Sequence, residues 1–126
     1  MNLRERRAQV RAYLGKTVTI QIDRPIGTAH EKNGNRWVYP INYGFIPGVL
    51  GGDGEELDVY LLGVDHPVRE AVCRVIGAVL REDDDEDKLI AAPPGMTFTA
   101  AEMAAAVHFQ ERFHVSRVVT ELPLNH

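Results

Sequence analysis

Short apolar segments separated by glycine and proline restrict this chain to folds that are built from short strands. Alternating residues such as Val18, Ile20 and Ile22 indicate a strand with one buried face. Gly77, inside the longest apolar segment, indicates a bulge or a bend of a barrel. Strands are predicted at residues 16–23, 57–62, 70–81, 88–92 and 115–122, with a further piece at 37–39.

Turn-forming residues dominate the stretches between these segments. Residues 24–36 are rich in Pro, Gly and Asn and are expected to form a loop. Prolines and glycines within residues 40–48 disfavour a long regular strand and favour short strand pieces joined by turns. The Gly-Gly-Asp-Gly sequence at residues 51–54 predicts a tight turn directly before the next strand.

Two helices are expected beside the strands. Residues 3–13 predict a short surface helix that carries several arginines. Thr99 and Glu102 have the spacing of a capping box, which would open a helix over about residues 100–114. The whole pattern predicts a mainly β (α+β) fold. It would be a small closed or partly open barrel with a C-terminal helix packed on it, forming a single domain over residues 1–126.

The charge of the chain is local rather than general. The formal net charge is −4, and an uninterrupted acidic run at residues 82–87 accounts for it. A nucleic-acid partner is not expected, because binding to phosphate backbones needs a broad basic stripe. No apolar run approaches the ~20 residues that cross a bilayer, so no membrane association is expected. With one cysteine, Cys73, and a charged N-terminus, the cytoplasm is the expected location.

Three acidic residues mark the first candidate site. Asp53, Glu55 and Asp58 leave the glycine-rich turn and enter a strand, where Asp58 faces away from Leu57 and Val59. Hard cations such as Mg²⁺ prefer several oxygen ligands, and a turn can aim two carboxylates at the same point. A solvated loop in which Asp and Gly only form the turn is the alternative interpretation.

The acidic run at 82–87 is the second candidate site. On its own such a run is typical of a solvated hairpin tip, and Lys88 directly after it would either neutralise the run or bind a phosphate. Two acidic turns at one barrel mouth would hold two or more cations, which is the arrangement used for attack of water on a phosphoryl group.

Two sequence blocks together resemble the soluble family I inorganic pyrophosphatases. The acidic signature stands here as Asp-Gly-Glu-Glu-Leu-Asp-Val at residues 53–59, and Tyr-Pro-Ile-Asn-Tyr-Gly-Phe-Ile at 39–46 matches the preceding block. Residues 77–93 match the block that follows, and the resemblance covers roughly residues 17–122. It implies a five-stranded oligonucleotide/oligosaccharide-binding-type (OB-like) barrel and hydrolysis of pyrophosphate to two phosphates with Mg²⁺ or Mn²⁺.

The resemblance also assigns roles to single residues. Asp53, Asp58, Asp83 and Glu86 would be metal ligands, Glu55 with Asp58 would be catalytic, and Tyr43 and Lys88 would bind phosphate. Glu55 stands where the family has the Asp that handles the attacking water. Bacterial relatives of this type are commonly hexamers, so a homo-oligomer is expected.

Several positions depart from the family pattern. Thr19, Gln21, Phe113 and His114 replace charged or hydroxyl groups that the family uses around the substrate, and the chain is shorter than typical members. Substitute cations for substrate binding are expected from the loop before residue 39, namely Arg24, Lys32 and Arg36. Two other functions therefore remain open: hydrolysis of another small phosphate compound, and a non-catalytic barrel that binds metal or phosphate.

Overall fold

A computed structural model describes residues 1–124 of the chain. The predicted single domain extends to residue 126, so its last two residues lie outside the described part. The elements follow in the order α1 (Leu3–Tyr13), β1 (Thr17–Arg24), β2 (Ala29–Lys32), β3 (Asn35–Val38), β4 (Asn42–Leu50), β5 (Glu56–Leu61), β6 (Glu70–Arg81), β7 (Lys88–Ala92), α2 (Ala100–Glu111) and β8 (Ser116–Val119).

Five strands close into a barrel, as the sequence predicts. The hydrogen-bonded order is β1-β4-β5-β7-β6, and β6 pairs again with β1, which closes the ring. All of these pairings are antiparallel except β5 with β7, which run parallel. The last strand, β8, pairs with the end of β6, beyond the part of β6 that pairs with β1. The closed form of the predicted barrel is therefore the one observed.

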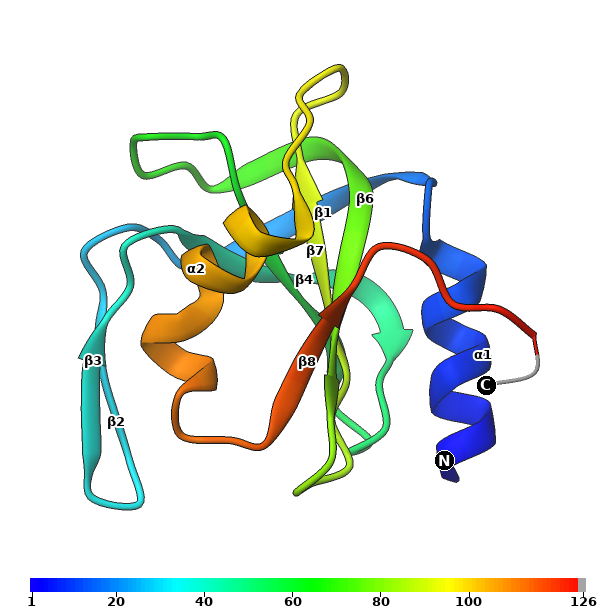
Figure 1. The fold of residues 1–126 in the computed structure, drawn as a ribbon. Coiled ribbons are helices and arrows are strands. Elements are labelled where there is room, and N and C mark those ends of the chain that lie inside the picture. Colours follow the sequence, from blue (N-terminus) through cyan, green and yellow to red (C-terminus); the bar gives the residue numbers. More distant parts are fainter. Residues whose placement is uncertain (125–126) are drawn as a thin grey trace.

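The two helices pack on opposite sides of the barrel (Figure 1). Val10 of α1 belongs to a core cluster with Ile20, Val59 and Leu89. The side chains on the other face of the same strands form a second cluster, which includes Met103 and Val107 of α2. Because both faces of the strands are covered, β7 is buried along its whole length. Both helices begin with capping boxes, at Asn2 and at the predicted Thr99.

The predicted loop at 24–36 is wrong in part, because it contains a β-hairpin. Strands β2 and β3 pair antiparallel and stand apart from the barrel, beside α2 (Figure 1). Their turn is Asn33-Gly34, and both residues have positive φ, 51° and 79°. Asn-Gly is the preferred pair for a two-residue hairpin turn, because both residues tolerate this left-handed conformation. That dipeptide was the signal for the hairpin in the sequence.

The prediction of short pieces at 40–48 is also wrong, because β4 is one nine-residue strand. Its pairing with β5 is regular up to Phe45, then shifts register before Leu50. Pro47 lies in the interrupted part, where no ladder bond from its nitrogen is required. The prediction for Gly77 is confirmed, since the pairing of β6 with β7 shifts between Val75 and Gly77.

Gly44 allows β1 and β4 to approach each other, and its substitution tests this packing. A Cβ atom at residue 44 would overlap the backbone carbonyl of Gln21. We expect Gly44→Ala to lower the free energy of unfolding by about 1–3 kcal/mol or more, as overpacking does when backbone must move. Urea denaturation measures this. Gly51→Ala is the matched control, since its Cβ would meet Leu57 at an ordinary 3.5 Å. Equal stability of the two variants would contradict the expectation.

Candidate active site

A cleft of about 320 Å³ opens between the barrel, the C-terminal end of α2 and the hairpin. Its walls combine positive, negative and aromatic side chains from almost every element of the fold. The lining residues are Arg24, His30, Glu31, Lys32, Trp37, Tyr43, Asp58, Arg81, Glu86, Lys88, Gln110 and His114. Tyr43, Asp58, Glu86, Lys88, Arg24 and Lys32 were predicted as site residues, and the structure brings them together here.

Lys88 lies at the centre of this group. Its Nζ donates to the Tyr43 hydroxyl at 2.7 Å and to Asp58 Oδ2 at 2.8 Å, and it lies 3.5 Å from Glu86 Oε1. The parallel pairing of β5 with β7 explains the contact. Val59 is the partner of Leu89, so Asp58 and Lys88 each precede a paired residue and share one edge of the barrel. Lys88 is nearly fully buried, with a side chain 3% exposed, and this charge is stable there because it is paired.

Arg24 approaches the same group from β1. Its guanidinium donates to the Tyr39 hydroxyl at 2.8 Å and lies 5.6 Å from the centre of the Tyr43 ring. Burial and the neighbouring carboxylate of Asp58 raise the pKa of Tyr43 well above its ordinary value, so this phenol stays protonated. Tyr43 therefore acts as a neutral hydroxyl between two cations, Arg24 and Lys88.

Sequence reasoning missed Arg81, the most connected charge of the cleft. Its side chain is 1% exposed and binds Glu111 through two nitrogens, at 3.1 and 2.7 Å. It also binds Asp84 at 2.9 Å and Glu86 at 3.3 Å. Desolvation alone would raise the pKa of the Glu111 carboxyl. The hydrogen bond and charge of Arg81, together with the Tyr60 hydroxyl and the charge of Lys88, outweigh this effect, so the pKa is lowered. The only signal in the sequence was a cation at the end of an apolar strand, directly before the acidic run.

Asp87 connects the acidic run to α1. Its Oδ1 accepts from Arg6 at 2.8 Å, from Arg7 at 2.9 Å and from the backbone of Arg81 at 3.1 Å. Arg6 and Arg7 are both buried, which corrects the expectation that α1 presents its arginines at the surface. These two residues stabilise the loop at 82–87 and are not part of a basic stripe for nucleic acid.

The predicted metal ligands separate into two places. Asp53, Asp58 and Glu86 line one small hollow beside the cleft, together with Asp87. Glu55 lines neither the hollow nor the cleft, but its backbone nitrogen donates to Asp53 Oδ1 at 3.0 Å, so it belongs to the same turn. These carboxylates offer only oxygen donors, which is the donor set that Mg²⁺ prefers.

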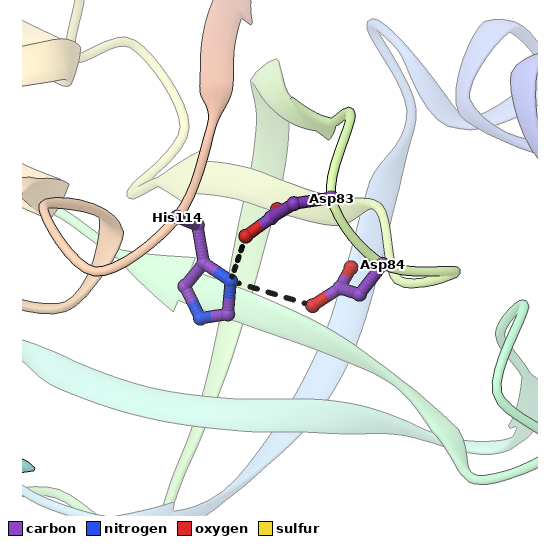
Figure 2. Close-up of side chains that lie close together, drawn as sticks. All are labelled: Asp83, Asp84 and His114. Atoms are coloured by element: carbon purple, nitrogen blue, oxygen red, sulfur yellow. Dashed lines mark hydrogen bonds and ion pairs between the residues drawn. The ribbon is translucent and has the colours of Figure 1, made fainter. Parts of the chain in front are cut away.

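Asp83 lies apart from the other predicted ligands. Its Oδ2 is 3.2 Å from His114 Nδ1, and Asp84 Oδ2 lies 3.5 Å from the same nitrogen. Figure 2 shows the three side chains converging from the acidic loop and from the segment after α2. Their ligand atoms all lie within 4.8 Å of one another, close enough to hold one ion. Within residues 1–124 this is the only such group of three, so the four predicted ligands do not form one compact site.

Arg36 lies outside the cleft, although it was predicted to bind substrate. Its guanidinium is largely exposed and pairs with Glu31 across the hairpin at 3.5 Å. Lys32, four residues earlier, does line the cleft. In the hairpin register Arg36 is opposite Glu31 and Lys32 is opposite Asn35, so the side chains of Arg36 and Lys32 lie on different faces of the hairpin.

The Arg81–Glu111 pair is open to a direct test of its contribution to stability. Arg81→Met leaves the buried Glu111 carboxylate without its main partner, so we expect a loss of about 3–5 kcal/mol in the free energy of unfolding. The double variant Arg81→Met/Glu111→Gln should recover part of that loss, because the most buried of the carboxylates that lose Arg81 is then neutral. Urea denaturation measures both variants, and Arg69→Met, at an exposed position, is the control. A double variant less stable than Arg81→Met would contradict this account.

Solved structures with a similar fold include two bacterial inorganic pyrophosphatases. The one from Coxiella burnetii has a TM-score of 0.60 at 23% identity, covering 89% of this chain and 90% of that chain. The one from Ehrlichia chaffeensis has a TM-score of 0.61 at 20% identity, covering 85% and 90%. At these identities the likeness confirms the predicted OB-like fold and carries no residue-level argument.

Sequence comparisons agree over shorter segments. The inorganic pyrophosphatase of Rickettsia prowazekii is 45% identical over 60 residues, which are 44% of this chain and 34% of that protein. That of Saccharolobus solfataricus is 42% identical over 84 residues, which are 62% and 44%. The chain therefore spans less than half the length of these curated relatives. The family model for inorganic pyrophosphatase matches residues 15–114, so most of the chain is covered and the chain belongs to the inorganic pyrophosphatase family.

Proposed function

We propose that this protein hydrolyses inorganic pyrophosphate to two phosphates with the help of Mg²⁺. The observation that carries the proposal is the position of Lys88, which lies between Tyr43, Asp58 and Glu86 in the cleft. A buried cation offers a binding place to a polyanionic substrate, and the carboxylates beside it offer one to the metal cations that accompany the substrate. Membership of the pyrophosphatase family supports the same choice of substrate.

The positive side chains of the cleft would hold the substrate. Lys88 and Arg24 would donate to phosphoryl oxygens, and the Tyr43 hydroxyl between them would donate a third hydrogen bond. Lys32 would add a cation from the hairpin side. Besides its role as a metal ligand, Asp58 would orient Lys88, because its hydrogen bond with Nζ fixes the direction of the ammonium group.

The carboxylates would hold the metal. Asp53, Asp58 and Glu86 line one hollow and would be the ligands of one cation. Asp83, which lies with Asp84 and His114 apart from that hollow, would contribute to a second. A bound divalent cation lowers the pKa of a coordinated water and neutralises phosphoryl charge. Glu55, exposed on the turn that holds Asp53, would accept the proton of the attacking water.

Release of phosphate from pyrophosphate, with and without Mg²⁺, tests this function. We expect Mg²⁺-dependent release from pyrophosphate that exceeds release from a panel of nucleotides and phosphate esters. Preference for one of those compounds would favour the first alternative, hydrolysis of another small phosphate compound. Metal and phosphate binding without any hydrolysis would favour a non-catalytic barrel.

The cytoplasm and a homo-oligomer complete the proposal. Among the described residues, no helix is both long and apolar enough to cross a membrane. The single cysteine, Cys73, is buried and free, as is usual in a reducing compartment.

The exposed apolar side chains of the protein lead us to expect that its copies associate in solution. Val72 and Val115 are 60% and 64% exposed, and burying them between copies would add apolar contact to a small core. We expect light scattering at micromolar concentration to give a mass that is a multiple of 14.1 kDa. A monomer mass would contradict the proposed assembly.

Asp58→Asn tests the metal ligands. We expect the affinity for Mg²⁺ to fall roughly 10- to 100-fold, a loss that even outer-shell partners of a metal typically cause. The variant should stay folded, because Lys88 keeps Tyr43 and Glu86 as partners. Isothermal calorimetry with Mg²⁺ measures the affinity. Asp65→Asn, at an exposed loop position, is the control. Unchanged Mg²⁺ affinity in Asp58→Asn would place the metal elsewhere.

A pair of arginine variants tests the positive side of the cleft. Arg24→Gln removes a charged contact, so we expect the Michaelis constant for pyrophosphate to rise about tenfold or more, with a smaller change in turnover. Arg36→Gln removes the same charge outside the cleft and should leave both constants almost unchanged. Steady-state kinetics separates the two. Equal effects would mean that general charge, rather than the cleft, attracts the substrate.

A further inference from the structure

Gln110, in the last turn of α2, is buried without a partner. The residue is 6% exposed, and its Oε1 is inaccessible to solvent and makes no hydrogen bond within the described part of the chain. It continues the buried stripe of Met103 and Val107 at helical spacing, a position that favours an apolar side chain. A buried polar group left unpaired lowers stability, so its presence calls for an explanation.

The neighbouring polar groups are already occupied by one another. Glu111 accepts from Arg81 and from the Tyr60 hydroxyl at 2.6 Å. Lys88 is occupied by Tyr43 and Asp58. The Gln110 carboxamide is therefore held by packing alone, and its bonding capacity is unused within residues 1–124.

The position of Gln110 shows what could use that capacity. Its side chain lines the cleft that also holds Arg24 and Lys88. Because Oε1 is inaccessible, Nε2 is the polar atom that this carboxamide offers to a ligand in the cleft. Oxygens of an ionised phosphoryl group only accept hydrogen bonds, so an amide N–H is complementary to them.

We propose that Gln110 binds a phosphoryl group in the cleft by donating from Nε2 to one of its oxygens. The inference rests on the proposed function for the nature of the ligand, a phosphate or pyrophosphate. Gln110 would supply a neutral donor from α2 to a cleft whose cations Arg24 and Lys88 come from β1 and β7. Such a contact would restore part of what the chain lacks at Phe113 and His114, which follow shortly after Gln110 in the sequence.

Gln110→Met removes the donor while keeping the length of the side chain. We expect the affinity for inorganic phosphate, measured by isothermal calorimetry with Mg²⁺ present, to fall about tenfold, since the lost bond is to a charged group. The Michaelis constant for pyrophosphate should rise by a similar factor. The melting temperature should stay equal or rise, because an unpaired polar group has been replaced by an apolar one. Gln110→Glu should weaken phosphate binding further, because it adds a negative charge.

Gln9→Met, the same substitution on α1, is the matched control and should leave phosphate binding unchanged. Unchanged phosphate affinity in both Gln110 variants would overturn the inference. So would a parent protein that binds no phosphate, or a loss of binding that follows only from a lower melting temperature. A parent protein that binds phosphate but does not hydrolyse pyrophosphate would reject the proposed function. In that case, weaker phosphate binding by Gln110→Met would still support the inference.

Discussion

The parallel pairing of β5 with β7 is the contact on which the cleft depends. It joins the strand after the first acidic turn to the strand after the acidic run, although these are separated in sequence by the whole of β6. The pairing places Asp58 beside Lys88, and with them the acidic turn at residues 51–54 beside the loop at 82–87. The cleft takes residues from both acidic segments, so its lining is complete only in the closed barrel.

Buried charge, rather than apolar packing, fixes the acidic loop. Asp87 anchors one end through Arg6 and Arg7, and Arg81 ties Asp84 and Glu86 to α2. Buried ion pairs give little net stability compared with apolar side chains of the same shape, since desolvation of the charges offsets their attraction. They do impose geometry, because the planar guanidinium of an arginine donates to carboxylates only in certain directions. The loop that carries Glu86 is thereby held at one distance from Lys88.

Local patterns in the sequence predicted most of the fold. Alternation identified β1 and β5, the capping box identified the start of α2, and Gly77 identified a bulge. The loop predicted at 24–36 misses the hairpin, although the Asn33-Gly34 pair is typical of a two-residue hairpin turn. The continuous β4 is not predicted, because the number of prolines and glycines in a segment does not show that Pro47 lies where the pairing of β4 with β5 is interrupted.

The candidate site was predictable only where it resembles a known pattern. Lys88 and Asp58 were found by spacing and resemblance, and their contact confirms that the two blocks meet. Arg81 carried only the weak signal of a cation before the acidic run, and Gln110 carried none, because their environment depends on partners such as Glu111 that only the closed fold brings near. The places of Asp83 and Arg36 were missed for the same reason, since the direction of a side chain in a loop or hairpin depends on tertiary contacts.

Two of the positions that depart from the family pattern, Phe113 and His114, have structural roles of their own in this chain. Phe113 packs against Trp37 with ring centres 5.3 Å apart, and His30 also packs against Trp37 at 5.1 Å. These contacts hold the hairpin against the end of α2 and place Lys32 at the cleft. His114 contacts Asp83 and Asp84, so the next residue fixes the acidic loop from the same side. Phe113 and His114 therefore hold the hairpin and the acidic loop near the cleft, and in the proposed function Lys32 of the hairpin supplies a positive charge that these two positions lack.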